Sequence, residues 1–304
     1  TNTVAGMPTA GLADEILMPG EGQVKALFSL GGNPMAAWPD QDKTLAAMNE
    51  LELNVSLDIK MSATAKLADY VIAPKLSLEV PGMTLPTESL TPYAMGYPEP
   101  YAMYSPAIVD PPEGSDVIEE WEFFYGLAQR MKLPLTLAAS YEWGPDAETP
   151  EVTELDMSRP PTNDELFEAL TKGARVSLSE VKKHPEGAIF PYEALVEPAD
   201  ADATGRLDFA DRTMMGELAE VALEPIDRDS YYAFRLVSRR LPDVHNSAGR
   251  DIPKLVRKWS YNPAFMNPED LADHGLEKGD MIEITSSHSS ILGIVEPEAG
   301  IRRG

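Results

Sequence analysis

The chain has 304 residues, of which 43% are hydrophobic and 25% charged, a composition typical of a globular protein of about two domains. Its 25 basic and 50 acidic residues give a formal net charge of −25, which disfavours binding to the phosphate backbone of a nucleic acid. There is no cysteine to form disulfides or thiolate metal sites, and the four histidines lack metal-ligand spacing. No apolar run approaches the roughly 20 residues that a membrane-spanning helix needs.

Residues 24–74 alternate between strand and helix patterns. Apolar runs that end at Gly, Asp or Pro predict strands at 24–30, 53–58 and 70–73, with helices between them at 40–51 and 62–68. This order predicts a parallel α/β sheet.

The middle of the chain is less regular. Dense prolines interleaved with Tyr and Met at 74–112 predict an ordered, extended excursion rather than a β-ladder; the alternative is a stretch that is disordered in isolation. An amphipathic helix is expected at 115–131, and a capping box at Thr162–Glu165 predicts a helix that runs to Thr171. The acidic stretch at 141–161 predicts a surface loop, and residues 186–230 predict a linker with weak strands.

The last segment has a different character. Alternation predicts a strand at 231–238, and two more are expected at 281–286 and 291–295. Asn267-Pro268-Glu269-Asp270 predicts a short helix with an N-cap, which Gly275 ends in a left-handed conformation. Strands with one short helix predict a small barrel.

Two polar features follow the first two predicted strands. The Gly31-Gly32-Asn33-Pro34 loop lies where open α/β sheets bind ligands, and its backbone can approach a phosphate or sugar closely. Asp58 ends the second strand, where a carboxylate can accept from ribose hydroxyls or from a guanine edge, with Ser62 and Thr64 following. The alternatives are a turn selected for its geometry and a helix N-cap at Asp58.

A third polar cluster follows the strand at 231–238 and contains Arg239, Arg240, His245 and Asn246. An arginine fork can bind a phosphate or a pterin carbonyl. The alternative is a surface arginine pair beside a polar turn.

Three stretches resemble a known family when taken together. The first is 25–34 (KALFSLGGNP) with Trp38-Pro39-Asp40; the second runs from Val55-Ser56-Leu57-Asp58 through 62–65 (SATA) to 68–74 (ADYVIAP); the third joins Arg239-Arg240 and Asn246 to 267–270, Gly275-Leu276 and Gly279-Asp280. In this order they resemble the molybdopterin oxidoreductase family, which includes formate dehydrogenases, nitrate reductases and thiosulfate reductases.

The resemblance implies a fold and its boundaries. Residues 1–185 would be the C-terminal half of a discontinuous Rossmann-like α/β domain that carries the Pro-rich excursion at 74–114. After a linker at 186–230, residues 231–304 would form a partial double-psi β-barrel that is truncated at its end. The chain would then be a C-terminal fragment of such an enzyme.

The same resemblance implies that the chain binds bis-molybdopterin guanine dinucleotide with Mo or W. The first region would hold guanosine and the second would contact pterin and phosphate; the implied cofactor-binding residues are Gly32, Asn33, Leu57, Asp58, Ser62, Arg239, Arg240 and Asn246. Ser62 stands where Thr is usual, and Glu79-Val80-Pro81-Gly82 lacks a Lys that some members carry. No catalytic residue or metal ligand can be assigned, and the metal ligand and any 4Fe–4S cluster would lie upstream of Thr1.

The function that the resemblance implies is two-electron redox chemistry by a molybdopterin-dependent oxidoreductase acting on a small-molecule substrate. An iron–sulfur electron-transfer subunit is a further partner that it allows. The alternatives are a non-catalytic structural relative that has lost the metal site and non-redox hydration on the same cofactor. The compartment stays open between cytoplasm and periplasm.

Overall fold

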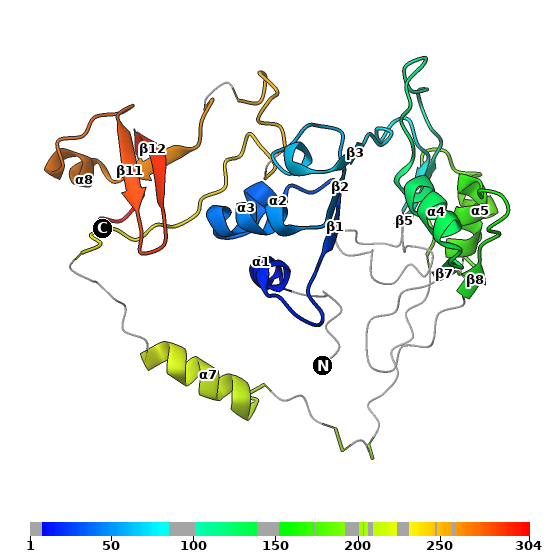
Figure 1. Cartoon of the computed structure of the whole chain (residues 1–304), viewed down its shortest axis with the longest axis horizontal. Coiled ribbons are helices and arrows are strands. Elements are labelled where there is room, and N and C mark those ends of the chain that lie inside the picture. The colour runs from blue at the N-terminus through cyan, green and yellow to red at the C-terminus, as the bar shows by residue number, and fades with distance from the viewer. Residues whose placement is uncertain are drawn as a thin grey trace. The chain divides into compact units, whose positions relative to one another are not determined.

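The computed structural model describes residues 8–84, 101–138, 152–172, 174, 176–191, 201–202, 204–205, 209–223, 231–246, 248–256 and 259–304. The chain divides into two compact units (Figure 1). Unit 1 comprises Thr1–Trp38 and Lys43–Val196, and unit 2 comprises Pro39–Asp42 and Glu197–Gly304.

A parallel sheet of three strands forms the first part of unit 1. Its order is β1 (Ala26–Leu30), β2 (Leu53–Leu57) and β3 (Tyr70–Ile72), and both neighbouring pairs run parallel. The three predicted strands and the parallel arrangement are therefore confirmed. Because the strands are parallel, their carboxyl ends, and the loops that follow them, lie at one edge of the sheet.

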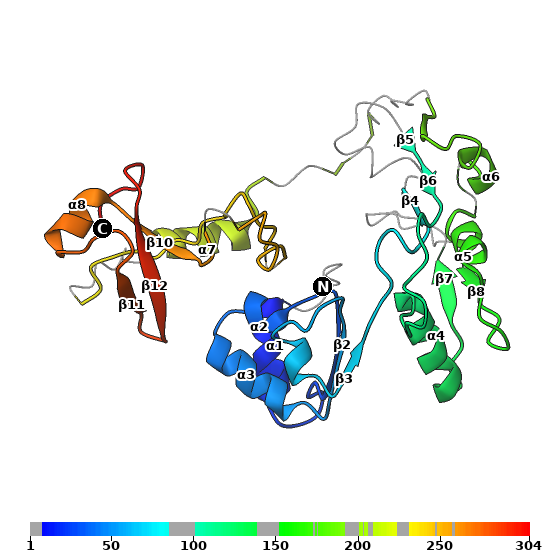
Figure 2. The same ribbon diagram turned by 90° about the horizontal axis from the view of Figure 1, so that it is seen from above.

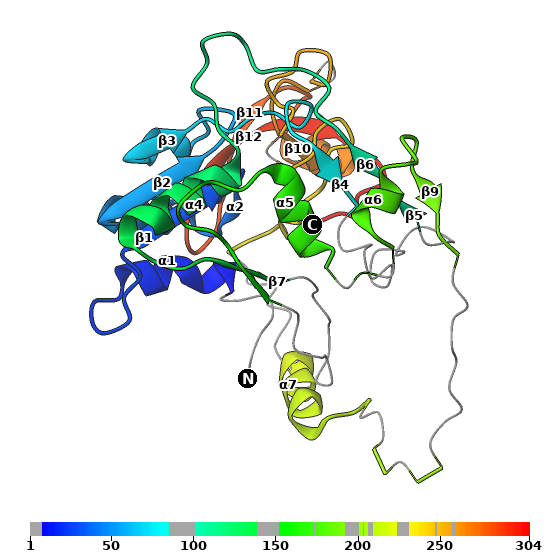
Figure 3. The same ribbon diagram turned by 90° about the vertical axis from the view of Figure 1, so that its right-hand side faces the viewer.

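Helices cover this sheet on both faces. α1 (Thr9–Leu17), α2 (Pro34–Ala37) and α3 (Gln41–Glu50) lie on one side of it (Figure 2), and Leu27 of β1 packs against their buried core, which includes Ile16 and Met48. The next side chain, Phe28, points to the other face and contacts the rings of Phe123 and Phe124, with centroids 5.9 and 6.4 Å apart. Those two rings belong to α4 (Glu120–Met131), which lies beside β1 (Figure 3).

The predicted helix at 115–131 starts five residues late in the structure. Glu119 and Glu122 form a capping box at the start of α4, and the preceding chain is extended because Ile118 bridges to Pro74. The predicted helix at 62–68 is reduced to the short 3₁₀ helix η1 (Ala65–Leu67). α1 and α2 were not expected from the sequence.

The excursion after β3 forms short ladders where it is described. β4 (Gly82–Met83) pairs with β6 (Tyr104–Ser105), and β5 (Tyr101–Ala102) pairs with β9 (Ala188–Ile189). These pairs agree with an ordered excursion, but the expectation that its prolines exclude β-ladders is wrong, because the paired residues themselves are not prolines and can exchange backbone hydrogen bonds. Residues 85–100 lie outside the described part of the chain.

The expected acidic loop at 141–161 contains a strand. β8 (Val152–Glu154) pairs with β7 (Thr136–Ala138), although residues 139–151 lie outside the described part.

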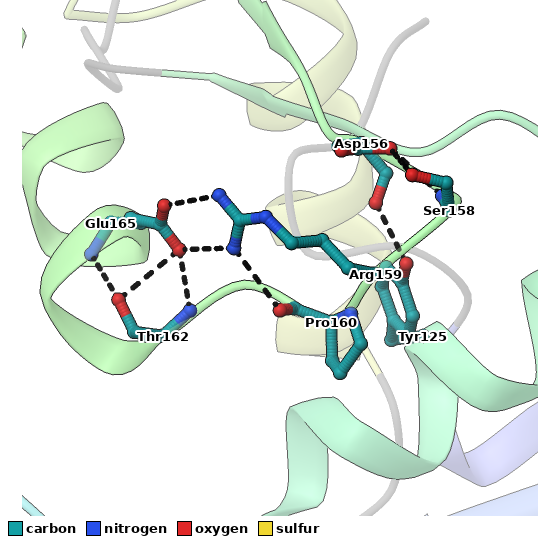
Figure 4. Close-up of polar contacts among 7 residues, drawn as sticks. All are labelled: Tyr125, Asp156, Ser158, Arg159, Pro160, Thr162 and Glu165. Carbon is teal, nitrogen blue, oxygen red and sulfur yellow. Dashed lines mark hydrogen bonds and ion pairs between the residues drawn. The ribbon is translucent and has the colours of Figure 1, made fainter.

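The predicted capping box before α5 (Asn163–Leu170) is confirmed (Figure 4). Thr162 Oγ1 accepts from the Glu165 N–H at 3.2 Å, while Glu165 Oε2 accepts from the Thr162 N–H at 2.8 Å. Arg159 binds both oxygens of Glu165, at 2.9 and 2.5 Å. These donors hold the pKa of Glu165 at about 2, with the Arg159 hydrogen bonds as the largest cause. α6 (Leu178–Val181) follows, with Ser177 as its N-cap.

Unit 2 contains a second sheet, of order β10–β12–β11. β10 (Pro263–Met266) runs parallel to β12 (Ser290–Pro297), and β11 (Met281–Thr285) is antiparallel to it. α8 (Pro268–Asp273) has Asn267 as its N-cap, with Oδ1 accepting from the Glu269 N–H at 2.9 Å, and Gly275 follows with φ +63°. This helix, its cap and the two antiparallel strands match the prediction; β10 was missed.

Two predictions for residues 186–238 are wrong in part. The expected linker contains α7 (Arg212–Leu223), a helix without a buried residue. The expected strand at 231–238 is not assigned to any ladder within the described residues, and its side chains stay exposed, with Leu236 at 70% and Val237 at 73%. Alternation gives a segment strand character, but a β-ladder also needs a hydrogen-bonded neighbour.

Candidate functional site

The first candidate site lies at the carboxyl edge of the β1–β3 sheet. Gly31 turns the chain after β1 with φ +56°, a conformation that favours glycine, and its N–H donates to the Leu57 carbonyl at 2.8 Å. Gly32 has no such requirement, because a Cβ there would meet the Leu30 oxygen at an ordinary 3.7 Å. The hydrogen bond from the Gly31 N–H to the Leu57 carbonyl ties the loop after β1 to the end of β2.

Asn33 is held by a residue in the loop after β2. Its Oδ1 accepts from the backbone N–H of Thr64 at 3.2 Å and from the Thr64 hydroxyl at 2.9 Å. The same hydroxyl accepts from the Met35 N–H at 3.1 Å, in the first turn of α2. Thr64 is fully buried, whereas Asn33 is half-buried. The structure therefore joins the two loops through Thr64, whose sequence position indicated only a hydroxyl near Asp58.

Asp58 and Ser62 lie in the same loop after β2. Asp58 is half-buried, its N–H donates to the Ile72 carbonyl at 3.2 Å, and its Oδ1 accepts from the Lys60 N–H at 3.1 Å. The Ser62 hydroxyl accepts from the Ala65 N–H at 3.2 Å, at the start of η1. Both side chains thus have local backbone partners, and Asp58 keeps a carboxylate oxygen with no hydrogen bond assigned within the described residues.

The side chain of Leu57 is fully buried in the sheet. Its carbonyl is already used by Gly31, as described above. A contact from this residue to a ligand would have to come from its backbone.

The second candidate site lies in unit 2, where Arg240 and Asn246 are brought together. Arg240 Nη1 donates to Asn246 Oδ1 at 3.2 Å, and Asn246 has φ +55° in the turn that His245 and Ala248 close with a β-bridge. A guanidinium carries five N–H donors, so this one bond leaves most of its capacity for an acceptor such as a phosphate.

Arg239 is directed elsewhere. Its Nη1 lies 3.0 Å from Glu298 Oε2, and its guanidinium lies 4.4 Å from the centroid of the Phe265 ring. The two arginines therefore differ: Arg239 binds Glu298 and lies over Phe265, whereas Arg240 has no assigned partner other than Asn246 among the described residues.

A polar network beside β12 was not found from the sequence. Glu296 is 4% exposed; its Oε1 accepts from the Tyr261 hydroxyl at 3.0 Å, and its Oε2 forms an ion pair with Lys278 Nζ, also at 3.0 Å. This carboxylate raises the pKa of the Tyr261 hydroxyl above its ordinary value, mainly through the hydrogen bond. No spacing in the sequence distinguishes Glu296 from the many other acids of the chain.

Within the described ranges, no group of three His, Cys, Asp or Glu side chains is placed to hold a metal ion. In the same part of the chain, no helix is long and apolar enough to cross a bilayer.

Comparisons with known proteins agree with the expected resemblance. Residues 234–304 match the family described as "Molydopterin dinucleotide binding domain". Over 288 residues the chain is 23% identical to "Probable oxidoreductase YyaE" of Bacillus subtilis (strain 168), a match that covers 93% of this chain and 39% of that protein. Its fold is similar to that of Acetylene Hydratase from Pelobacter acetylenicus, with a TM-score of 0.64, 17% identity, and coverage of 97% of this chain and 38% of the other.

The resemblance to the molybdopterin oxidoreductase family is thereby confirmed. The chain spans about two fifths of the length of each of these two proteins.

Proposed function

We propose that this chain, which carries a molybdopterin dinucleotide binding domain, holds the guanosine and pterin parts of a bis-molybdopterin guanine dinucleotide cofactor in an oxidoreductase. When bound, such a cofactor supplies two-electron redox chemistry at Mo or W. The chain's own role is to bind and orient this cofactor. The rest of such an enzyme would supply the metal ligand and the groups that bind the substrate, together with any contacts to an iron–sulfur cluster or a partner subunit.

The observation that carries the proposal is the polar edge of the β1–β3 sheet. Asn33 and Asp58 follow adjacent parallel strands, at the edge where such sheets bind ligands. Asn33 offers amide hydrogens, and Asp58 offers a carboxylate that can accept both the N1–H and the exocyclic amine of guanine. The donor set therefore fits a guanosine.

The cluster in unit 2 supports the second half of the proposal. It lies within the matched domain, and Arg240 keeps donors that suit a phosphate or a pterin carbonyl. With a net charge of −25, the chain as a whole repels anions, so an anionic cofactor requires such local donors. As a fold proposal, unit 1 contributes half of a Rossmann-like domain and residues 231–304 contribute part of a double-psi barrel.

The test replaces Asp58 in protein purified from cells that synthesise the cofactor. Asp58→Ala should lower the guanine released by acid hydrolysis by about tenfold per protein, because a hydrogen bond to a charged group contributes about 1.5–3 kcal/mol. Asp110→Ala removes an exposed carboxylate in another loop and is the matched control. Guanine content at the wild-type level in Asp58→Ala would show that Asp58 does not hold guanosine.

A hydration reaction on the same cofactor is the second candidate, because one structure of similar fold is named a hydratase. The two candidates differ in electron balance. An oxidoreductase must reduce or oxidise a redox dye together with its substrate, whereas a hydratase turns over without a net electron acceptor. A non-catalytic relative would bind no metal at all.

A further inference from the structure

We infer that Thr64 is a positioning residue that fixes the side-chain amide of Asn33, so that this asparagine can only donate hydrogen bonds to a ligand. The inference rests on the proposed function, since it concerns the same edge of the β1–β3 sheet. Beyond the proposed function, Thr64 gains a role at this edge, and Asn33 is limited to donating hydrogen bonds.

The backbone N–H of Thr64, which can donate a hydrogen bond but cannot accept one, fixes the orientation of the Asn33 side-chain amide. The backbone N–H of Thr64 lies 3.2 Å from the Asn33 side chain, and a peptide N–H is only a donor. The atom that faces it must therefore be the amide oxygen. An amide orientation is usually assigned from its hydrogen-bond network, and here the network allows one choice.

The Thr64 hydroxyl strengthens this choice. Its oxygen accepts from the Met35 N–H at 3.1 Å, so its single hydrogen is left for Asn33 Oδ1, 2.9 Å away. Thr64 is fully buried, so water does not compete for either bond. A buried and satisfied network of this kind is rigid, because any rearrangement leaves an unpaired polar group.

Two donors to one oxygen leave the other end of the amide for a ligand. Asn33 is half-buried, and within the described residues no acceptor is assigned to its Nδ2 group. An asparagine amide can in general both donate and accept, but the two bonds from Thr64 limit Asn33 to donation. It therefore selects an acceptor atom, a carbonyl or phosphate oxygen, while Asp58 on the next loop selects donors.

Asn33 and Asp58 together should discriminate between guanine and adenine. Guanine has a carbonyl oxygen beside an N1–H, and adenine has an amine beside an unprotonated N1. A donor-only Asn33 with the Asp58 carboxylate should thus prefer the guanine edge. Removing the Thr64 hydroxyl leaves the backbone N–H of Thr64 as the one assigned donor to Asn33 Oδ1 among the described residues, so the amide should be held less firmly and that preference should weaken.

The test uses the full chain, with guanosine 5′-diphosphate as the probe and adenosine 5′-diphosphate for comparison, in isothermal titration. Thr64→Val keeps the size and the backbone N–H but removes the hydroxyl; it should weaken guanosine diphosphate binding about tenfold. Thr64→Ser restores the hydroxyl and should bind within about twofold of wild type. Melting temperatures check that each variant is folded. Wild-type affinity in a folded Thr64→Val variant overturns the inference.

A measurement without ligand separates the two proposals. In protein labelled with ¹⁵N-asparagine, the Asn33 Nδ2 resonances, identified by their loss in Asn33→Asp, should shift in Thr64→Val and return in Thr64→Ser. If wild type binds no guanosine diphosphate but these resonances shift, the proposed guanosine site fails and the positioning role stands. If the resonances are unchanged in Thr64→Val, Thr64 does not position Asn33.

Discussion

Ser29 of β1 lies directly opposite Ser56 of β2 in the parallel register, and both hydroxyls are buried without a hydrogen-bond partner among the described residues. Each serine is the last but one residue of its strand, two positions before Gly31 and Asp58 respectively. The candidate ligand edge is therefore built on two buried polar groups that the sheet does not satisfy.

Replacing both serines should not destabilise the protein. A buried hydroxyl without a partner has a desolvation cost of about 1–3 kcal/mol, so we expect Ser29→Ala with Ser56→Ala to leave the free energy of unfolding unchanged or to raise it. Denaturant unfolding measures this. A loss of about 2 kcal/mol or more would show instead that the hydroxyls bind a buried water molecule or each other.

The side chain of Leu57 should stabilise the fold by packing and should not contact the ligand. Because the side chain is fully buried, Leu57→Ala should cost about 2–5 kcal/mol of stability. Leu57→Met conserves volume and should cost less than about 1.5 kcal/mol, with guanosine diphosphate affinity unchanged. A large loss of affinity in a stable Leu57→Met variant would contradict a contact made only by the backbone.

The two arginines of unit 2 should differ in their effect on cofactor retention. Among the residues that the structure describes, Arg240 makes one assigned hydrogen bond, to Asn246, whereas Arg239 binds Glu298 and lies over Phe265. We expect Arg240→Gln to lower the pterin content of purified protein more than Arg239→Gln, which should instead lower the melting temperature. Equal pterin loss in both folded variants would contradict this division.

The Arg159–Glu165 pair should make the start of α5 sensitive to acid. The folded pKa of Glu165 is depressed to about 2, below the ordinary value of about 4.3, so its stabilising effect is complete above pH 5. It is lost as the pH falls from about 4 through 2. Amide hydrogen exchange near Thr162 should therefore accelerate between pH 4 and 2, corrected for intrinsic rates, and Glu165→Gln should remove most of this change. If wild type and Glu165→Gln show the same pH dependence of exchange, the Arg159–Glu165 pair does not control the acid sensitivity of α5.

Local signals in the sequence were sufficient for several elements of the fold. Apolar runs that end at Gly31, Asp58 and Pro74 marked the three parallel strands, and the capping residues Thr162 and Asn267 marked two helices. Each of these signals lies within the segment that it shapes, so no knowledge of distant contacts was needed.

The missed elements depend on long-range partners or lack a strong pattern. β10 is short, begins with Pro263 and exists through its pairing with β12, while α7 carries Gly216 and buries no residue. Residues 231–238 show the converse, since their alternation predicts a strand but no ladder partner is present among the described residues.

The candidate site was predictable as a location but not as a network. Strand order placed Asn33 and Asp58 at one edge of the sheet. That Thr64 binds Asn33 across 31 residues of chain, and that Arg240 and not Arg239 meets Asn246, depends on side-chain geometry that no spacing encodes.

If this chain holds the guanosine and pterin parts of a molybdopterin cofactor, as proposed, the purified protein must contain both, and its organic content can be measured. The protein would be isolated from cells shown to synthesise the cofactor, and guanine and oxidised, fluorescent pterin would be quantified in the same sample. We expect the protein to release both, with less guanine from Asp58→Ala and an unchanged amount from Asp110→Ala. A folded protein that releases neither compound would contradict it.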